Sequence, residues 1–338
     1  MAPITPLRIG LVGCGYQGGI FAQTIAQMTS LQLVACADLD VEVATRVAAG
    51  APTFATVDEL LYAVDVDAVI VATSHDALYE CALAAIRANK HVLIEKPIGM
   101  DETEAAQLEE AVAHTGVCFM AGYSFRGLPA LQKVHELLRG AAIGEVHTVS
   151  GGIGVGPLAS GWIASPTTGG GPLLYVGSHL VDELLWLLDD KPVEVEATIR
   201  YRADTRADET TTFQLQMGRG AVVQGMVTQA GDTFFNTLEF YGRGGMISLR
   251  GVLFNYTVEL TQTKTLGGAQ PLLMRFPSVA DLRLVAHHQQ LAEFVQAVQE
   301  RRQPTVTVHD GRLVLQVLDA IARSGRTGQP VRLVQAHR

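Results

Sequence analysis

Hydrophobic positions in the first 122 residues alternate between short β-branched runs and longer stretches with helical periodicity. This alternation predicts parallel strands joined by crossover helices. The predicted strands are Leu7 to Val12, Gln32 to Ala37, Ala68 to Ala72, His91 to Ile94 and Val117 to Ala121. The predicted helices are Gly19 to Met28, Leu78 to Ala88 and Glu102 to Ala113. We therefore expect a doubly wound parallel α/β sheet in residues 1–122.

After a further predicted helix at Pro129 to Arg139, the pattern changes to long runs that alternate between apolar and polar residues. Such alternation is typical of antiparallel strands with one face buried. The expected strands are Val193 to Arg202, Thr210 to Met217, Ala221 to Thr228 and Thr237 to Tyr241. Two helices, about Leu282 to Arg301 and Asp310 to Ser324, follow them. Residues 123–338 are therefore expected to form a second, α+β domain with an open, mostly antiparallel sheet.

The net charge and the lengths of the apolar runs limit the kinds of partner that we expect the protein to bind. The chain has 338 residues and a formal net charge of −9, and we find no basic patch, which disfavours nucleic acid and anionic membranes. No apolar run approaches the ~18 residues of a membrane span, and the first residues are typical of a strand entering a turn rather than of a secretory signal. We expect a cytoplasmic protein that acts on a small molecule.

The residues that commonly bind metals are scattered. The four cysteines, which lack CxxC spacing, are Cys14, Cys36, Cys81 and Cys118. Scattered cysteines are typical of free thiols in a reducing compartment. His287 and His288 are adjacent, and on a helix they would diverge by ~100° and could not chelate one ion. We expect four free cysteines and no metal.

A glycine-rich turn stands between the first predicted strand and the first predicted helix. Its residues are Gly13, Cys14, Gly15, Tyr16, Gln17 and Gly18. In a GxGxxG pattern at this place, the glycines permit a tight turn and close backbone approach, so that a pyrophosphate can bind unpaired N–H groups at the positive end of the helix. This favours a nucleotide-binding turn over an ordinary glycine-rich one.

Asp38 ends the second predicted strand, 20 residues after Gly18. A carboxylate there can accept hydrogen bonds from the ribose hydroxyls of a dinucleotide. It would also repel a 2′-phosphate, and the neighbouring Leu39 offers no cation to bind one. The alternative is that Asp38 caps the next helix. The two features together predict NAD as the cofactor, in preference to NADP.

Glu95, Lys96 and Pro97 follow the fourth predicted strand directly. Ligands of open parallel sheets bind at the carboxyl ends of the strands. A lysine there can polarise the oxygen of a secondary alcohol or pass its proton on. The alternative is a solvated surface lysine, and the position at a strand end favours the functional interpretation.

A run of three glycines, Gly169 to Gly171, leads into a predicted helix that carries His179 and Asp182. Residues three apart share one helix face, so the carboxylate could orient the imidazole. The alternative is a histidine satisfied at a helix start with Asp182 as a first-turn charge. Spacing alone favours that alternative.

These motifs resemble the Gfo/Idh/MocA family, named after glucose-fructose oxidoreductase, inositol dehydrogenase and rhizopine catabolism. The resemblance runs nearly end to end and rests on the GxGxxG turn, Asp38, Val71 to Thr73, Glu95 to Pro97, Phe125 with Arg126, and the glycine run followed by His179 and Asp182. It implies a Rossmann domain, a cis Lys96–Pro97 peptide bond, and assembly as a homodimer or homotetramer through the second sheet. It also implies that Lys96 lies by the nicotinamide and that His179 is the general acid or base.

The chain departs from the family around the cofactor and the histidine. Ser74 and His75 stand where Pro-Asn is usual, which changes the nicotinamide-side lining, and with Thr73 they are expected to contact the cofactor. Tyr175 replaces an aspartate that commonly helps to hold the sugar. It could be an aromatic wall of the substrate pocket, donate a hydrogen bond or exchange a proton.

Three further residues complete the predicted substrate contacts. Phe234 stands about where some sugar-oxidising members have a tyrosine, and Trp162 is not followed by the frequent arginine. These changes indicate a less polar pocket. Arg126 could bind a carboxylate or phosphate of the substrate, or form an interdomain salt bridge.

The predicted function is an NAD(P)-dependent oxidoreductase that acts on CH–OH groups, transferring hydride between the nicotinamide and a secondary alcohol or ketone of a sugar, cyclitol or related diol. Two alternatives remain. One is a non-catalytic NAD-binding sensor or regulator. The other is a redox-neutral hydrolase or eliminase that uses bound NAD.

Overall fold

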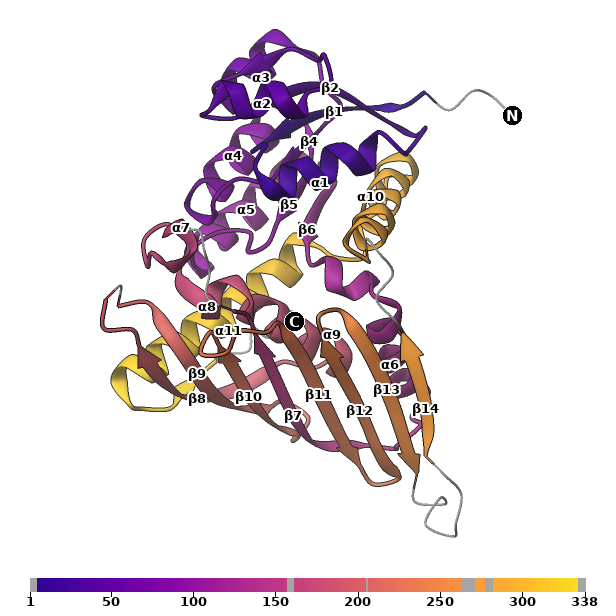
Figure 1. The fold of residues 1–338 in the computed structure, drawn as a ribbon, viewed down its shortest axis with the longest axis vertical. Helices are drawn as coiled ribbons and strands as arrows, with labels where there is room; N and C mark the ends of the chain where they lie inside the picture. The colour runs from indigo at the N-terminus through magenta and orange to yellow at the C-terminus, as the bar shows by residue number, and fades with distance from the viewer. Residues whose placement is uncertain (1–4, 157–160, 205, 263–270, 277–281, 334–338) are drawn as a thin grey trace. The chain divides into compact units, whose positions relative to one another are not determined.

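A six-stranded parallel sheet occupies the first part of the computed structural model, which describes residues 5–156, 161–204, 206–262, 271–276 and 282–333 (Figure 1). Its strand order is β3-β2-β1-β4-β5-β6, and every pair is parallel. The strands are β1 (Leu7–Val12), β2 (Leu31–Ala37), β3 (Thr53–Phe54), β4 (Ala68–Val71), β5 (His91–Glu95) and β6 (Phe119–Gly122). The order reverses between β1 and β4, which is where open α/β sheets bind ligands at their carboxyl edge.

The crossover helices are amphipathic, and side chains that accept backbone N–H bonds begin several of them. They are α1 (Tyr16–Ile25), α2 (Val41–Val47), α3 (Val57–Ala63), α4 (His75–Arg87) and α5 (Glu102–Thr115). Asp40, Thr56 and Asp101 cap α2, α3 and α5 respectively. The β-branched run of β4 is buried along its whole length. The doubly wound sheet predicted from the sequence is confirmed.

A nine-stranded sheet forms the second part of the chain, in the order β14-β13-β12-β11-β7-β10-β9-β8-β15. Its strands are β7 (Val146–Gly154), β8 (Pro192–Tyr201), β9 (Asp208–Met217), β10 (Val222–Thr228), β11 (Phe235–Gly242), β12 (Gly245–Val252), β13 (Asn255–Gln262), β14 (Leu272–Phe276) and β15 (Val331–Arg332). Only the β7–β10 pair is parallel among these described strands. The open, mostly antiparallel sheet is therefore confirmed.

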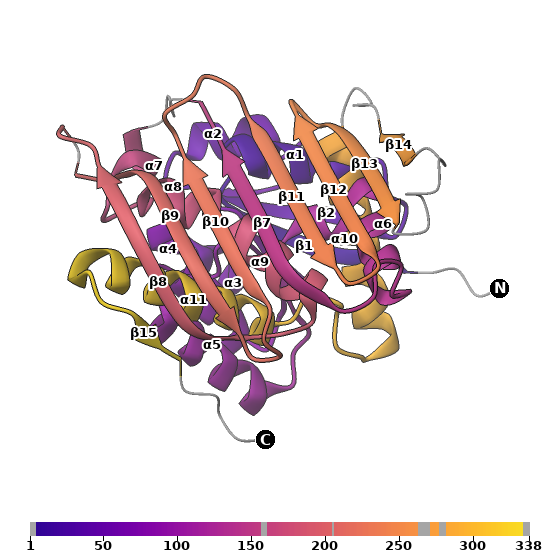
Figure 2. The same cartoon turned by 90° about the horizontal axis from the view of Figure 1, so that it is seen from below.

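Helices cover one face of this sheet. They include α6 (Pro129–Arg139), α8 (Gly171–Tyr175) and α9 (Gly177–Leu188), with the short helices η1 (Ser124–Gly127) and α7 (Gly161–Ala164) beside them in the chain. On β9, Phe213 and Leu215 are buried while Thr212, Gln214 and Gln216 are exposed. Figure 2 shows the exposed face with no helix of the described residues in front of it.

Contacts divide the chain differently from the predicted boundary at residue 122. One compact unit comprises Met1–Ser124 and Arg283–Leu315, and the other Phe125–Leu282 and Gln316–Arg338. Helix α10 (Leu282–Glu300) lies beside α1 (Figure 1), where His287 meets Phe21 edge to face at 4.8 Å. The Ala121 N–H donates to the Val306 carbonyl at 3.0 Å. Residues 283–315 thus belong to the first unit, although the sequence analysis assigned them to the second domain.

Helix α11 (Val308–Thr327) begins in the first unit, where Arg312 pairs with Glu102 and Glu109 of α5. Its later residues belong to the second unit, and Ser324 Oγ accepts the Ala197 N–H of β8 at 3.0 Å. Helical periodicity predicted both α10 and α11. Periodicity alone does not tell which of the two sheets a helix packs against.

The four cysteines are free thiols, as predicted. Within the described residues, no helix is long and apolar enough to cross a membrane. The same residues contain no group of three His, Cys, Asp or Glu side chains arranged to hold a metal ion.

Candidate active site

The predicted site residues fall in both units, and each group is described within its own unit. In the first unit, Gly13 has a positive φ of 86°, and a Cβ there would lie 2.5 Å from the Ala72 carbonyl. A Cβ at Gly18 would lie 2.1 Å from the Gly13 oxygen. Neither position accepts a side chain, because the turn and the start of α1 approach the strands too closely.

Gly15 has a different role from Gly13 and Gly18. It is the N-cap of α1, no side chain of the described residues caps the helix there, and a Cβ would meet nothing within 4 Å. A ligand therefore has room beside Gly15, at the positive end of the helix. Such a helix start can receive a pyrophosphate, and binding by the three glycines stays a prediction.

Asp38 lies beside this turn and is tied to it. Its carboxylate accepts the Cys14 N–H at 2.8 Å through one oxygen and the Asp40 N–H at 2.9 Å through the other. It does not cap α2, because Asp40 does so. A carboxylate has about four acceptor positions, so Asp38 keeps capacity for ribose hydroxyls. Leu39 is 90% exposed and brings no charge to the site.

The end of β4 provides the second helix start on the same edge of the sheet. Ser74 is the N-cap of α4, and Thr73 Oγ1 donates to the Ser74 carbonyl at 3.1 Å. His75 is the first residue of the helix and is buried, as is Leu78 one turn later. Tyr16, at the start of α1, is 66% exposed.

Glu95 is the last residue of β5 and Lys96 follows it at this edge, and both are buried. Glu95 accepts a hydrogen bond from the Gln17 amide at 3.2 Å, which joins the glycine-rich turn to the end of β5. His287 of α10 approaches the same carboxylate at 3.6 Å. The Lys96–Pro97 bond is cis, as the resemblance implied.

The electrostatics of Lys96 separate it from a surface lysine. Burial lowers the pKa of Lys96 to about 8, although the neighbouring Glu95 carboxylate opposes the shift. A lysine with this pKa exchanges protons near neutral pH. The residues of the first unit thus fit a dinucleotide: Gly13 to Gly18 for the pyrophosphate, Asp38 for the ribose, and Lys96 for the nicotinamide end.

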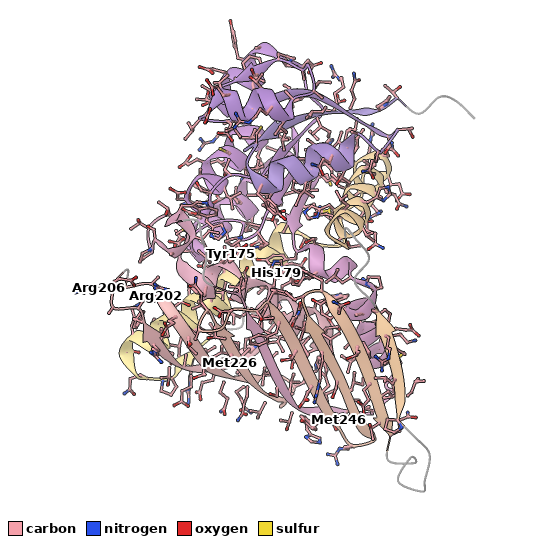
Figure 3. The ribbon with its side chains drawn as sticks, viewed as in Figure 1. Tyr175, His179, Arg202, Arg206, Met226 and Met246 are labelled. Carbon is pink, nitrogen blue, oxygen red and sulfur yellow. The ribbon has the colours of Figure 1, made fainter. Side chains whose placement is uncertain are left out.

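In the second unit, Tyr175 ends α8 and His179 stands in the first turn of α9. Both lie at one end of this unit, and Met246 of β12 lies at the opposite end (Figure 3). The glycine run positions these helices: Gly171 has a φ of 77°, and a Cβ there would lie 2.1 Å from an oxygen of Asp208. Burial raises the pKa of Asp208 to about 6, while the Leu173 N–H donates to its carboxylate at 2.8 Å.

Two consecutive residues of η1 contact α9 one turn apart. The Phe125 ring stacks on the His179 ring with centroids 3.9 Å apart and planes 13° from parallel. Arg126 Nε and Nη2 donate to the Asp182 carboxylate, with an Nη2–Oδ1 distance of 2.6 Å. This pair is nearly completely buried. The salt bridge foreseen for Arg126 therefore lies within the second unit, and Asp182 is a buried ion-pair partner rather than a first-turn charge.

Two more phenylalanines extend the aromatic group on His179. Phe234 and Phe254 stack with centroids 4.6 Å apart, and Phe125 meets each of them edge to face at 6.3 and 6.4 Å. We call Phe125, Phe234 and Phe254 the phenylalanine cluster. All three side chains keep partial exposure, whereas His179 is 7% exposed.

Phe254 belongs to an unusual turn. Val252 pairs with Asn255, so only Leu253 and Phe254 connect β12 to β13, and their φ angles are 48° and 62°. Two-residue hairpins with both φ positive favour Asn-Gly. Each bulky residue in this conformation costs roughly 1–2 kcal/mol, which the aromatic contacts of Phe254, at about 0.5–1.5 kcal/mol each, offset only in part.

A polar group lies deeper in the same unit. Asn236 of β11 donates to Glu183 of α9 at 2.8 Å, and both are completely buried. Burial raises the pKa of Glu183 to about 8, and it also raises the pKa of Tyr256 on β13 well above the ordinary value for a tyrosine. Glu183 and Phe254 were not predicted as site residues, since a glutamate in an apolar helix and a Leu-Phe pair give no motif.

Trp162 stands apart from these groups. It is on α7 and 37% exposed, and its carbonyl accepts the Thr168 hydroxyl at 2.7 Å. Among the predicted site residues of the first unit, Gln17 thus contacts Glu95. In the second unit Arg126 contacts Asp182, and Phe125 lies between His179 and Phe234, contacting both. Contact of Tyr175, Trp162, Arg126 and Asp182 with substrate stays a prediction.

Known protein families match both units. The model described as "Oxidoreductase family, NAD-binding Rossmann fold" matches residues 7–123, and the GFO/IDH/MocA C-terminal domain matches residues 131–248. The chain belongs to the Gfo/Idh/MocA family. Among its relatives is the 1,5-anhydro-D-fructose reductase of Ensifer adhaerens, 28% identical over 282 residues, with 81% of this chain and 82% of the relative covered.

Other relatives cover almost the whole chain. The inositol 2-dehydrogenase of Rhizobium meliloti is 24% identical, with coverage of 94% and 96%. The crystal structure of GenD2 from gentamicin A biosynthesis, in complex with NAD, has a TM-score of 0.86 and 28% identity and covers 99% of this chain and 98% of its own. This Gfo/Idh/MocA protein is therefore an oxidoreductase with an NAD-binding Rossmann domain.

Proposed function

We propose that this Gfo/Idh/MocA protein is an NAD-dependent dehydrogenase or reductase of a secondary alcohol or ketone in a sugar, cyclitol or related diol. The observation that carries the proposal is Lys96, a buried lysine with a pKa of about 8 at the carboxyl end of β5. The names of its relatives as sugar and cyclitol dehydrogenases and reductases support the substrate class.

The preference for NAD over NADP rests on Asp38 and Leu39. The Asp38 carboxylate, fixed by the Cys14 and Asp40 N–H groups, accepts the ribose hydroxyls. It repels a 2′-phosphate, and the exposed Leu39 offers no cation to compensate. Bound NAD supplies the hydride acceptor, or in its reduced form the donor, at the substrate carbon.

The remaining chemistry is proton movement and positioning by the chain. We assign to Lys96 the polarisation of the reacting oxygen and to His179 the transfer of its proton. Phe125, stacked on the imidazole, fixes the plane of the His179 ring. Arg126 and Asp182 hold α9, while Tyr175 and Trp162 contact the substrate.

A substrate panel with two simultaneous readouts tests the proposal. Sugars, cyclitols and diols are incubated with NAD, while NADH absorbance and product formation are followed together. The proposal predicts NADH formed in equal amount to product for at least one compound. Product without NADH indicates redox-neutral chemistry, and tight NADH binding without any product indicates a sensor; either result contradicts the proposal.

We propose that the chain forms a homodimer or homotetramer through the exposed face of the second sheet. On β9 and β10 that face presents Gln214, Gln216, Gln224 and Met226, which are uncharged, whereas the charged residues Glu196 and Arg250 lie on strands to either side. Uncharged polar and methionine side chains suit an interface better than charged ones. Light scattering after size exclusion measures the mass: a multiple of 36.2 kDa supports the proposal, and a Met226→Lys variant should then shift towards the monomer.

We propose that the protein acts in the cytoplasm. The four free thiols support a reducing compartment. Fractionation of the source cells, followed by immunoblotting, checks this: the protein should appear with cytosolic markers.

A further inference from the structure

We propose that the phenylalanine cluster is a substrate subsite beside His179 and that it binds an apolar ring or substituent next to the reacting carbinol. The inference rests on the proposed function, because it takes His179 as the residue at the reacting oxygen. It deepens that function by naming the substrate class: cyclic alcohols or ketones with an apolar face, rather than fully hydroxylated rings.

Contacts define the subsite. Phe125 covers one face of the His179 ring, and Phe234 and Phe254 stand at right angles to Phe125. Three partly exposed phenyl rings thus form one group, in which Phe125 lies directly on the imidazole and the other two contact Phe125. Aromatic rings bind apolar surface and offer no strong hydrogen bond to a hydroxyl.

The polar side chains two residues further along the chain, on β11 and β13, are buried. Asn236, two residues after Phe234, is completely buried and gives its amide to Glu183. Tyr256, two residues after Phe254, is 2% exposed. A substrate hydroxyl placed against these rings would therefore find no hydrogen-bond partner in Asn236 or Tyr256.

The strained turn is an independent observation. Leu253 and Phe254 keep left-handed backbone conformations that glycine or asparagine would adopt without strain. Backbone strain of this kind concentrates at functional sites. The turn places the Phe254 ring against Phe234. An Asn-Gly turn would have no aromatic ring to make this contact.

The test compares two ligands that differ in their hydroxyls. The full chain with saturating NADH is titrated calorimetrically with trans-1,2-cyclohexanediol and with myo-inositol, each also in Phe234→Thr and Phe254→Gly variants. The matched control is Phe235→Thr, because the Phe235 ring lies instead against Gly154. Binding needs no turnover, so the readout is separate from the dehydrogenase reaction.

We expect the wild type and Phe235→Thr to bind the cyclohexanediol about tenfold more tightly than the inositol. In Phe234→Thr and Phe254→Gly the preference should fall to about twofold or less. Phe254→Gly relieves the strained turn, so its melting temperature should stay close to that of the wild type and separate lost binding from lost folding.

Each other outcome is decisive. Equal affinities in the wild type, tighter binding of inositol, or binding of neither ligand would overturn the subsite. A preference that survives in both cluster variants would do the same. If the preference behaves as expected but no panel compound yields NADH, the subsite stands and the proposed dehydrogenase function fails.

Discussion

Glu183 is a completely buried carboxyl group with an amide partner in Asn236. Because burial raises the pKa of Glu183 to about 8, the folded protein keeps a proton there that the unfolded chain releases above its ordinary pKa of about 4.3. The free energy of unfolding therefore falls as pH rises from about 4.3 to about 8, and it levels off above that.

Replacing this acid by its amide should remove the pH dependence. Glu183→Gln should unfold at about the same urea concentration as the wild type at pH 5, and at pH 8.5 it should be more stable by about 4 kcal/mol. Urea titrations at the two pH values measure the difference. The control is Glu196→Gln, at an exposed position of β8, which should change the free energy of unfolding by the same small amount at both pH values. If Glu183→Gln also differed from the wild type by the same amount at both pH values, the raised pKa of Glu183 would be contradicted.

We also expect a single residue, Asp38, to set the preference for NADH over NADPH. Asp38→Asn removes the negative charge but keeps a similar shape, so NADH affinity should fall about tenfold while NADPH affinity rises. Fluorescence titration with both cofactors measures the ratio. Asp40→Asn is a matched control two residues away, because asparagine also caps a helix well; the prediction fails if both variants change the ratio equally.

At the scale of elements, the buried Arg126–Asp182 pair ties η1 to α9. Removing one partner leaves a buried charge unpaired, so Asp182→Asn should lower the free energy of unfolding by about 3 kcal/mol. The double variant Arg126→Met with Asp182→Leu should recover most of that loss, because it buries no charge.

Denaturant unfolding of Arg126→Met, Asp182→Leu and the double variant completes this cycle. NADH affinity is the internal control, since the cofactor residues lie in the first unit and should be unaffected. Additive losses in the double variant would show that the pair does not couple the two elements.

Most elements were predictable because their apolar periodicity is strong, and the predicted helix Pro129 to Arg139 matches α6 residue for residue. Strand β7 was missed because three of its nine residues are glycine, which weakens a strand signal. Close packing explains the glycine at Gly154, because a Cβ there would lie 2.2 Å from the Phe235 ring. The β12–β13 hairpin was missed because Leu253 and Phe254 give no turn signal.

At the scale of the whole molecule, the sequence predicted both sheets from their different apolar periodicities, and it predicted the GxGxxG turn from its place between β1 and α1. It did not predict that residues 283–315 join the first unit. That choice depends on long-range contacts such as Arg312 with Glu102 and Glu109, which periodicity does not encode. The phenylalanine cluster was also hidden, since its members lie far apart in the chain.

We propose that Lys96 serves the reaction rather than the fold or the binding of the cofactor. The most direct measurement is kcat/KM for NADH formation by Lys96→Met, beside the Kd of NADH and a surface control, Lys133→Met on α6. The account predicts a loss of about a hundredfold or more in kcat/KM for Lys96→Met. It also predicts little change in the Kd of NADH and a control like the wild type. A Lys96→Met enzyme with the wild-type kcat/KM would contradict it.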